Sequence, residues 1–154
     1  RNPSAKLSLD TKLNTNVAML YTYPGMNPSL VSSLSKCDGV ILIGMGLGHI
    51  PVNLAGEPMC ASILPEVKEL ISSGIPVVLV SQTIYGRVDM NVYTNQRALL
   101  DAGVIGNMCD FTPESAYAKL MWVLGREKKM DKVKKMMETN LVGEISERSE
   151  IANY

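Results

Sequence analysis

The sequence predicts an α/β fold with three layers, a parallel sheet flanked by helices as in flavodoxin-like domains. Two observations carry this prediction: three short aliphatic runs have the length of strands, and segments with helical periodicity separate them. The runs at 39–45 and 76–82 are apolar on consecutive residues, which is typical of parallel strands covered on both faces. We therefore expect strands at 17–23, 39–45 and 76–82, joined by right-handed crossovers.

Five helices are expected between and after these strands. Each has a capping residue, a proline in its first turn or an apolar stripe at helical spacing. In chain order they are a helix capped by Asn27 with Pro28 in its first turn, one from Pro65 to Gly74, one from about Val92 to Ala102, one from Thr112 and Pro113 to Gly125, and one that carries Met130, Val133 and Met137. Val104 and Ile105 are candidates for a short fourth strand.

The composition is that of a globular protein with the length of one domain. The chain has 154 residues, of which 46% are hydrophobic and 19% charged. Lys and Arg together number 15, as do Asp and Glu, so no net charge draws the molecule to nucleic acid or a membrane. The three cysteines, at 37, 60 and 109, form no C-x-x-C pair, which favours reduced thiols in a cytoplasmic protein over a zinc site. We expect no metal and no cofactor.

The first sixteen residues, RNPSAKLSLDTKLNTN, are polar and have little periodicity. We interpret residues 1–16 as the remnant of an interdomain linker, 17–145 as the folded domain and 146–154 as a C-terminal tail. The chain is then expected to be the C-terminal part of a longer protein.

Polar residues are concentrated in the loops that follow the three expected strands. These loops are YPGMN at 23–27, GMGLGHIP at 44–51 and SQTIYGRVDMNVY at 81–93. The carboxyl ends of parallel strands lie at one edge of the sheet, where open α/β sheets bind ligands. The sequence therefore predicts a polar functional edge.

None of these loops holds a complete catalytic constellation. The glycines of GMGLGH are followed by His49, Ile50 and Pro51, whereas a dinucleotide-binding fingerprint opens a helix, so backbone turns are favoured. A structural role beside a subunit contact is favoured for His49, the only histidine, because no nucleophile accompanies it. The basic run at 126–135 is interpreted as a solvated helix face, not an RNA contact. Taken alone, the residues indicate a binding or assembly module.

Four motifs in order carry a resemblance to a known family. GMGLGHIP, SQTIYGRVDMNVY, AGVIGNMCDFTPESAYAKLMWVLG and TNLVGEI extend over most of residues 12–149. Together they resemble the smaller C-terminal domain of the asparaginase/glutaminase family. The stretches YGRV-x-x-NVY, AYAKLMWVLG and TNLVGEI-x-ERS are most similar to the D subunit of the archaeal glutamyl-tRNA(Gln) amidotransferase.

The resemblance implies a role that this chain cannot fulfil alone. In that family, two threonines, an Asp and a Lys of a larger N-terminal domain hydrolyse the amide, and nothing in this chain matches that domain. The smaller domain closes the active site of a second copy in a homodimer. The family tyrosine that reaches across the dimer to a catalytic threonine corresponds to Tyr93, and Asn91 lies near the position that faces the substrate amino group.

The full-length protein would hydrolyse glutamine and pass ammonia to a partner subunit that binds tRNA and ATP and amidates Glu-tRNA(Gln). Two alternatives stay open: the C-terminal domain of a cytoplasmic L-asparaginase, and a non-catalytic dimerisation domain. The preference for glutamine or asparagine is not set by the residues present.

The chain departs from the family pattern at three loop positions. Met45, Thr83 and Asp89 stand where the family usually has Thr, a small residue and Asn, and residues 53–62 form a longer connection. These departures put effector binding near 44–52 in doubt. We also expect the apolar residues of the 44–52 loop, namely Leu47, Ile50, Pro51 and Val52, to be exposed and to mediate association.

Overall fold

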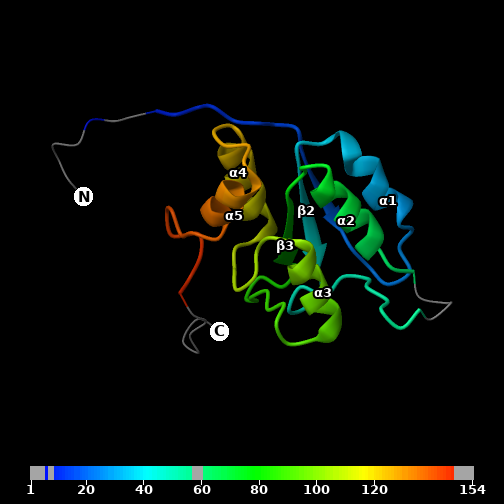
Figure 1. Cartoon of the computed structure of the whole chain (residues 1–154). Helices are drawn as coiled ribbons and strands as arrows, with labels where there is room; N and C mark the ends of the chain where they lie inside the picture. The colour runs from blue at the N-terminus through cyan, green and yellow to red at the C-terminus, as the bar shows by residue number, and fades with distance from the viewer. Residues whose placement is uncertain (1–5, 7–8, 57–60, 148–154) are drawn as a thin grey trace.

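A computed structural model describes residues 6, 9–56 and 61–147 (Figure 1). Strands β1 (Val17–Tyr21), β2 (Gly39–Gly44) and β3 (Val77–Ser81) form one parallel sheet in the order β1-β2-β3. Val17 is paired with Gly39, and Val40 with Val77. The three predicted strands and their parallel pairing are confirmed, each strand being one or two residues shorter than predicted. The fourth strand is reduced to a single parallel bridge between Val78 and Ile105.

The predicted helices are also present, with small shifts of their ends. They are α1 (Ser29–Ser32), which continues into the 3-10 helix η1 (Ser33–Lys36), α2 (Leu64–Ser72), α3 (Thr94–Ala102), α4 (Pro113–Leu124) and α5 (Met130–Met137). The hydroxyl oxygen of Thr112 caps α4 by accepting from the Ser115 N–H. Gly103 ends α3 in the left-handed conformation, at φ 95°, which glycine adopts without strain. Helix α3 begins two residues later than predicted.

The strand order explains which helices cover which face of the sheet. Right-handed crossovers between strands in sequential order place every connecting helix on the same face. Helices α1, α2 and α3 accordingly pack on one face, and the two helices that follow the last crossover, α4 and α5, cover the other (Figure 1). The three-layer architecture predicted from the sequence is confirmed.

The core is divided by the sheet into two clusters. Val40, Leu42, Val77 and Leu79 face the crossover helices, and their neighbours Ile41, Ile43, Val78 and Val80 face α4 and α5. Every residue of β2 and β3 is buried, as the consecutive apolar residues predicted. Strand β1 is at an edge, and Met19 and Tyr21 on it are exposed.

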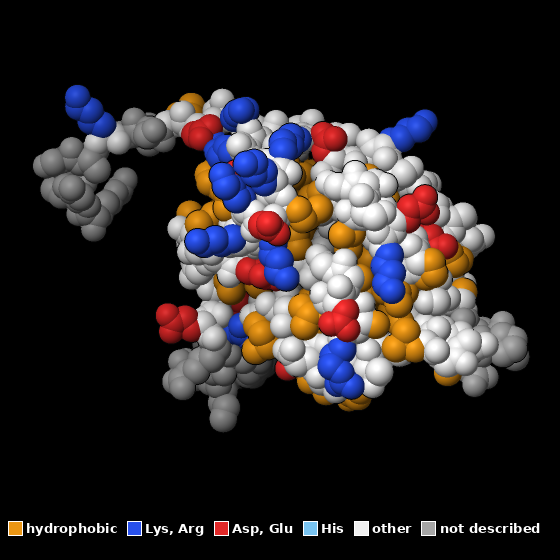
Figure 2. Space-filling view, in the orientation of Figure 1, with side chains coloured by type: hydrophobic (Ala, Val, Ile, Leu, Met, Phe, Trp, Pro, Cys, Tyr) orange, Lys and Arg blue, Asp and Glu red, His pale blue; other side chains and the backbone are white. Residues whose placement is uncertain are grey.

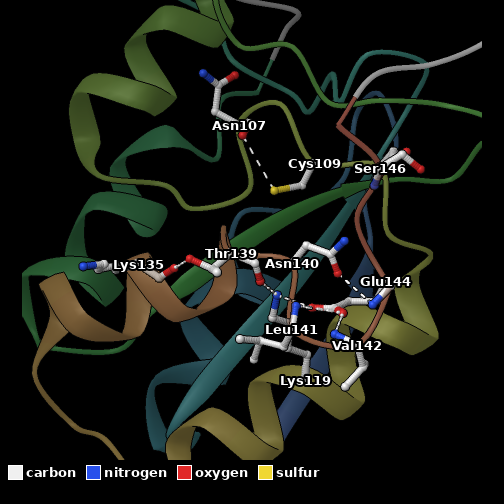
Figure 3. Close-up of polar contacts among 12 residues, drawn as sticks. Asn107, Cys109, Lys119, Lys135, Thr139, Asn140, Leu141, Val142, Glu144 and Ser146 are labelled. Carbon is white, nitrogen blue, oxygen red and sulfur yellow. Dashed lines mark hydrogen bonds and ion pairs between the residues drawn. The ribbon is translucent and has the colours of Figure 1, made fainter. Parts of the chain in front are cut away.

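A buried ion pair fastens the C-terminal segment, residues 139–146, to α4 (Figure 3). The Lys119 ammonium lies 2.5 Å from the Glu144 carboxylate and donates to the Thr139 carbonyl at 2.6 Å. The Glu144 carboxylate also accepts from the N–H groups of Leu141 and Val142. Burial acts to raise the pKa of Glu144, but the hydrogen bonds from Lys119 and the backbone outweigh it and lower this pKa to about 2.

The basic run at 126–135 forms a solvated surface around α5, as expected. Val133 and Met137 are buried against the sheet, while lysines of the run point outward. Figure 2 shows Lys and Arg side chains over α4 and α5 with acidic side chains among them. One of the acidic partners is Glu127, 3.2 Å from Lys132. Within the described residues, no helix is long and apolar enough to cross a membrane.

Candidate functional site at the carboxyl edge of the sheet

The glycine loop, residues 44–49, and the 81–93 loop lie side by side where β2 and β3 end. Ser81 donates from its hydroxyl to the Gly46 carbonyl at 2.5 Å, and the Gln82 N–H donates to the Gly44 carbonyl at 2.8 Å. Further along, the Asp89 N–H donates to the Leu47 carbonyl at 3.1 Å. The two loops are therefore joined by hydrogen bonds along their length.

The glycine loop is a tight backbone turn, which confirms the interpretation favoured from the sequence. Met45 and His49 form an antiparallel bridge with hydrogen bonds of 2.7 and 2.8 Å. A side chain at Gly44 would place its Cβ 2.8 Å from the backbone of Gly48 and His49. Gly48 has φ 91° and lies against Val88, so the turn needs glycine for conformation and for space.

The 81–93 loop contains an anchored part and an exposed part. Val88 and Met90 are buried, and the Met90 N–H donates to the side-chain oxygen of Asn107 at 2.9 Å. Arg87 extends away from the edge, 3.3 Å from Asp110, and donates to the Ser146 carbonyl at 2.9 Å. These residues fix the loop to the rest of the domain, whereas Ile84, Tyr85, Val92 and Tyr93 are exposed.

Tyr93 stands in the exposed part, immediately before α3. Its backbone is extended, at φ −112° and ψ 149°, and the residue is 52% exposed. Its hydroxyl makes no hydrogen bond with any residue that the structure describes, but its ring contacts His49, with the centroids 4.9 Å apart and the planes tilted by 58°. Sequence reasoning treated His49 and Tyr93 separately, whereas the fold brings them together. Tyr93 is at the surface and does not pack as an apolar helix residue.

Asn91 is exposed too, but its side chain is used locally. Its backbone N–H and its amide nitrogen both donate to one carboxylate oxygen of Asp89, at 3.0 and 2.9 Å. The Asn91 carbonyl accepts from Arg97 at 3.0 Å. Asp89, a departure from the family pattern, thus acts as the acceptor that orders this turn.

The exposed apolar surface lies only in part where the sequence placed it. Ile50 and Val52 of the 44–52 loop are buried, at 7% and 8% exposure, whereas Leu47 is 37% exposed and Pro51 is half-buried. The expectation of exposure is therefore confirmed for Leu47 and wrong for Ile50 and Val52, because the chain after the glycine turn returns to the core cluster on the side of the sheet covered by α1, α2 and α3. Further exposed apolar side chains at this edge lie in the 81–93 loop, namely Ile84, Tyr85, Val92 and Tyr93.

Two other features bear on chemistry. Burial raises the pKa of the Cys109 thiol to about 12, with a further contribution from Glu138, so this thiol is a poor nucleophile. Cys37 and Cys109 are free thiols, and Cys60 lies outside the described residues. Among the described residues no group of three His, Cys, Asp or Glu side chains could hold a metal ion.

The sequence matches a known domain family. Residues 16–137 match the family described as the Glutaminase/Asparaginase C-terminal domain. The chain belongs to this family. The fold agrees, because the thermostable L-asparaginase of Thermococcus kodakarensis superposes with a TM-score of 0.82 at 34% identity, over 96% of this chain and 43% of that one. L-asparaginase I of Vibrio cholerae superposes with a TM-score of 0.78 at 30% identity, over 95% of this chain and 42% of that one.

Curated relatives extend the family assignment. The D subunit of the glutamyl-tRNA(Gln) amidotransferase of Pyrococcus abyssi is 39% identical over 97% of this chain and 32% of the relative. That of Pyrococcus furiosus is 43% identical over 90% of this chain and 30% of the relative, and that of Methanothermobacter thermautotrophicus is 39% identical over 98% and 33%. The chain therefore spans about a third of the length of the curated relatives it matches.

Sequence reasoning missed Gln96, which is 1% exposed on α3 and donates to the Leu47 carbonyl at 2.9 Å. A signal was present: Gln96 lies three residues before buried Leu99, on the inner face of a predicted helix. A polar residue in such a stripe indicates a buried hydrogen bond.

Proposed function

We propose that this chain is the C-terminal domain of the D subunit of a glutamyl-tRNA(Gln) amidotransferase. The observation that carries the proposal is the similarity to the archaeal D subunits, at 39% identity over 97% of this chain. In the proposed full-length protein, an N-terminal domain hydrolyses glutamine, and the ammonia is used by a partner subunit that binds tRNA and ATP. The proposal places the protein in the cytoplasm, with residues 1–16 as interdomain linker, 17–145 as the domain and 146–154 as a tail; residues 1–5, 7–8, 57–60 and 148–154 lie outside the described residues.

The part played by this domain is to complete an active site of a second copy. Tyr93 supports this because its hydroxyl is unused within the described part of the chain, and its ring is presented at the carboxyl edge. In the proposed dimer this hydroxyl hydrogen-bonds a catalytic threonine across the interface and orients it for attack on the amide carbon. Asn91 lies two residues away, near the amino group of the substrate. The domain supplies no nucleophile of its own.

The test is Tyr93→Phe in the full-length protein. The change keeps the ring and its contact with His49 but removes the hydroxyl, so the fold should persist. A lost orienting hydrogen bond at a reacting group lowers turnover by about 100-fold. Glutamine turnover and the melting temperature are measured together, and Tyr21→Phe, an exposed tyrosine of edge strand β1, is the matched control with unchanged turnover. Full turnover in Tyr93→Phe would contradict the proposal.

A second candidate function is that of an L-asparaginase. The superposition on the L-asparaginase of Thermococcus kodakarensis favours it. The two differ in substrate and partner: an amidotransferase D subunit should prefer glutamine and respond to its partner, whereas an asparaginase should prefer asparagine and act alone. Ammonia release from both amides, with and without the partner, separates them. The 154-residue chain alone should release none from either.

A further inference from the structure

The direction of the Tyr93 ring depends on the glycine loop. Tyr93 precedes the first residue of α3, so the helix fixes its backbone but not its side chain. Its ring contacts His49, which the bridge to Met45 holds within the glycine turn. Any movement of this turn relative to α3 would therefore move the surface against which the Tyr93 ring rests.

One backbone carbonyl joins the glycine loop to both sides of Tyr93. The Leu47 carbonyl, near the apex of the loop, accepts from the Asp89 N–H at 3.1 Å and from the Gln96 side-chain amide at 2.9 Å. Asp89 precedes Tyr93 by four residues, and Gln96 follows it by three. The contact Tyr93–His49, the chain from His49 to Leu47, the hydrogen bond from Gln96 to Leu47 and the chain from Gln96 back to Tyr93 form a closed ring.

Glutamine at position 96 lowers the stability of the fold relative to an apolar residue of similar size. It is 1% exposed, and its side-chain oxygen has no hydrogen-bond partner among the described residues. A buried acceptor without a partner destabilises the fold, whereas an apolar side chain of similar size would pack there without that cost. The bond from its amide nitrogen to Leu47 is what the glutamine provides and an apolar residue would not.

We propose that Gln96 is a positioning residue, which holds the glycine loop through the Leu47 carbonyl and so keeps His49 against the ring of Tyr93. Its consequence for turnover rests on the proposed function. The positioning itself does not, because it concerns only contacts within this chain.

The positioning is tested by NMR on the single histidine. Because His49 is the only histidine in the chain, its ring C–H resonances are assigned without ambiguity. Tyr93→Leu removes the neighbouring aromatic ring and defines the shift that its loss produces. We expect Gln96→Met to move the His49 resonances at least half of the way to their positions in Tyr93→Leu. The control, Asn16→Ala, removes another amide-to-carbonyl bond, of 2.9 Å to Lys36 at the opposite edge of the sheet, and should leave them unmoved.

A double-variant cycle separates the loss of ring contact from a direct effect of residue 96. In the Tyr93→Leu background, Gln96→Met should hardly move the His49 resonances, because the ring that produced the shift is gone. An equal movement in both backgrounds would overturn the proposal, as would unmoved resonances in Gln96→Met or in Tyr93→Leu itself. Gln96→Leu, which loses the same amide, replaces Gln96→Met if that variant does not fold. Failure of both to fold would also overturn it.

The catalytic consequence is measured in the full-length protein. Gln96→Met should lower kcat for glutamine about tenfold, less than Tyr93→Phe, with little change in KM, because the hydroxyl is present but misplaced. If Tyr93→Phe keeps full turnover while the NMR cycle behaves as expected, the proposed function fails and the positioning stands. If Tyr93→Phe is impaired and the NMR cycle shows no coupling, the positioning fails alone.

Discussion

The 81–93 loop and the C-terminal segment, residues 139–146, both carry polar motifs of the family, but they use their polar groups differently. In the C-terminal segment, the Glu144 carboxylate is matched by Lys119 and by backbone N–H groups of its own turn. In the 81–93 loop, by contrast, the Tyr93 hydroxyl has no partner in the described part of the chain, and the residue is 52% exposed. We call residues 139–146 with Lys119 the closed region, because its charged groups are paired within the domain. We call the exposed part of the 81–93 loop the outward region.

One residue of the 81–93 loop, Arg87, contacts the C-terminal segment. It belongs to the 81–93 loop by sequence but donates to the carbonyl of Ser146, in the C-terminal segment. It therefore belongs to the closed region by its contacts. A polar residue in a loop is evidence for a site only after the partners available inside the domain have been counted.

The largest effect on stability is expected from breaking the ion pair between Lys119 and Glu144 in the closed region. Lys119→Met keeps the length of the side chain but leaves the Glu144 carboxylate without its cation, so the free energy of unfolding should fall by about 3 kcal/mol. The measurement is urea denaturation at neutral pH. The matched control is Lys132→Met, which breaks the ion pair to Glu127. The Lys132 side chain is 63% exposed, so this loss should be much smaller. Equal losses in the two variants would refute the distinction.

Acid should remove the stability that the Glu144 carboxylate contributes to the closed region. The pKa of Glu144 is lowered from 4.5 to about 2 in the folded chain, so the stability it contributes is complete above pH 4.5 and is lost as pH falls toward 2. Glu144→Gln has no such titration. The difference in unfolding free energy between the native chain and Glu144→Gln should therefore be constant near neutrality and shrink below pH 4.5. A difference that stayed constant down to pH 2.5 would show that the carboxylate charge is not the source.

A smaller effect is expected from altering the outward region, because it concerns association and not folding. Ile84→Asp places a charge in the exposed apolar part of the 81–93 loop and should weaken self-association of the chain about tenfold in sedimentation velocity. Val142→Asp is the control, since Val142 is 90% exposed but lies in the C-terminal segment. If Val142→Asp weakened association and Ile84→Asp did not, the outward surface would have been assigned to the wrong region.

The layers of the fold could be predicted from sequence because they rest on local patterns. Consecutive aliphatic residues marked β2 and β3, and Thr112 with Pro113 marked the start of α4. The edge position of β1 could not be predicted, because strand order is set by contacts between distant segments. For the same reason the burial of Ile50 and Val52 was missed: their apolar character is the same in a core and on a surface.

The candidate site was predicted only as a set of loops. That Tyr93 would stand outside α3 follows from its extended backbone, which no residue-type preference specified. Its contact with His49 joins residues 44 positions apart, and periodicity carries no information at that distance. The hydrogen bond from Gln96 to Leu47 spans 49 positions and was missed for the same reason.

Complementation between two inactive variants tests the central claim, that Tyr93 completes the active site of another copy. One copy of the proposed full-length protein carries Tyr93→Phe, and the other has the threonine proposed as nucleophile in its N-terminal domain replaced by alanine. In a mixed dimer, the intact threonine of the first faces the intact Tyr93 of the second. Random mixing of equal amounts should restore about a quarter of the native turnover, since half of the dimers are mixed and each has one complete site. Turnover no higher than that of the Tyr93→Phe protein alone would place Tyr93 outside the partner's active site and contradict the account.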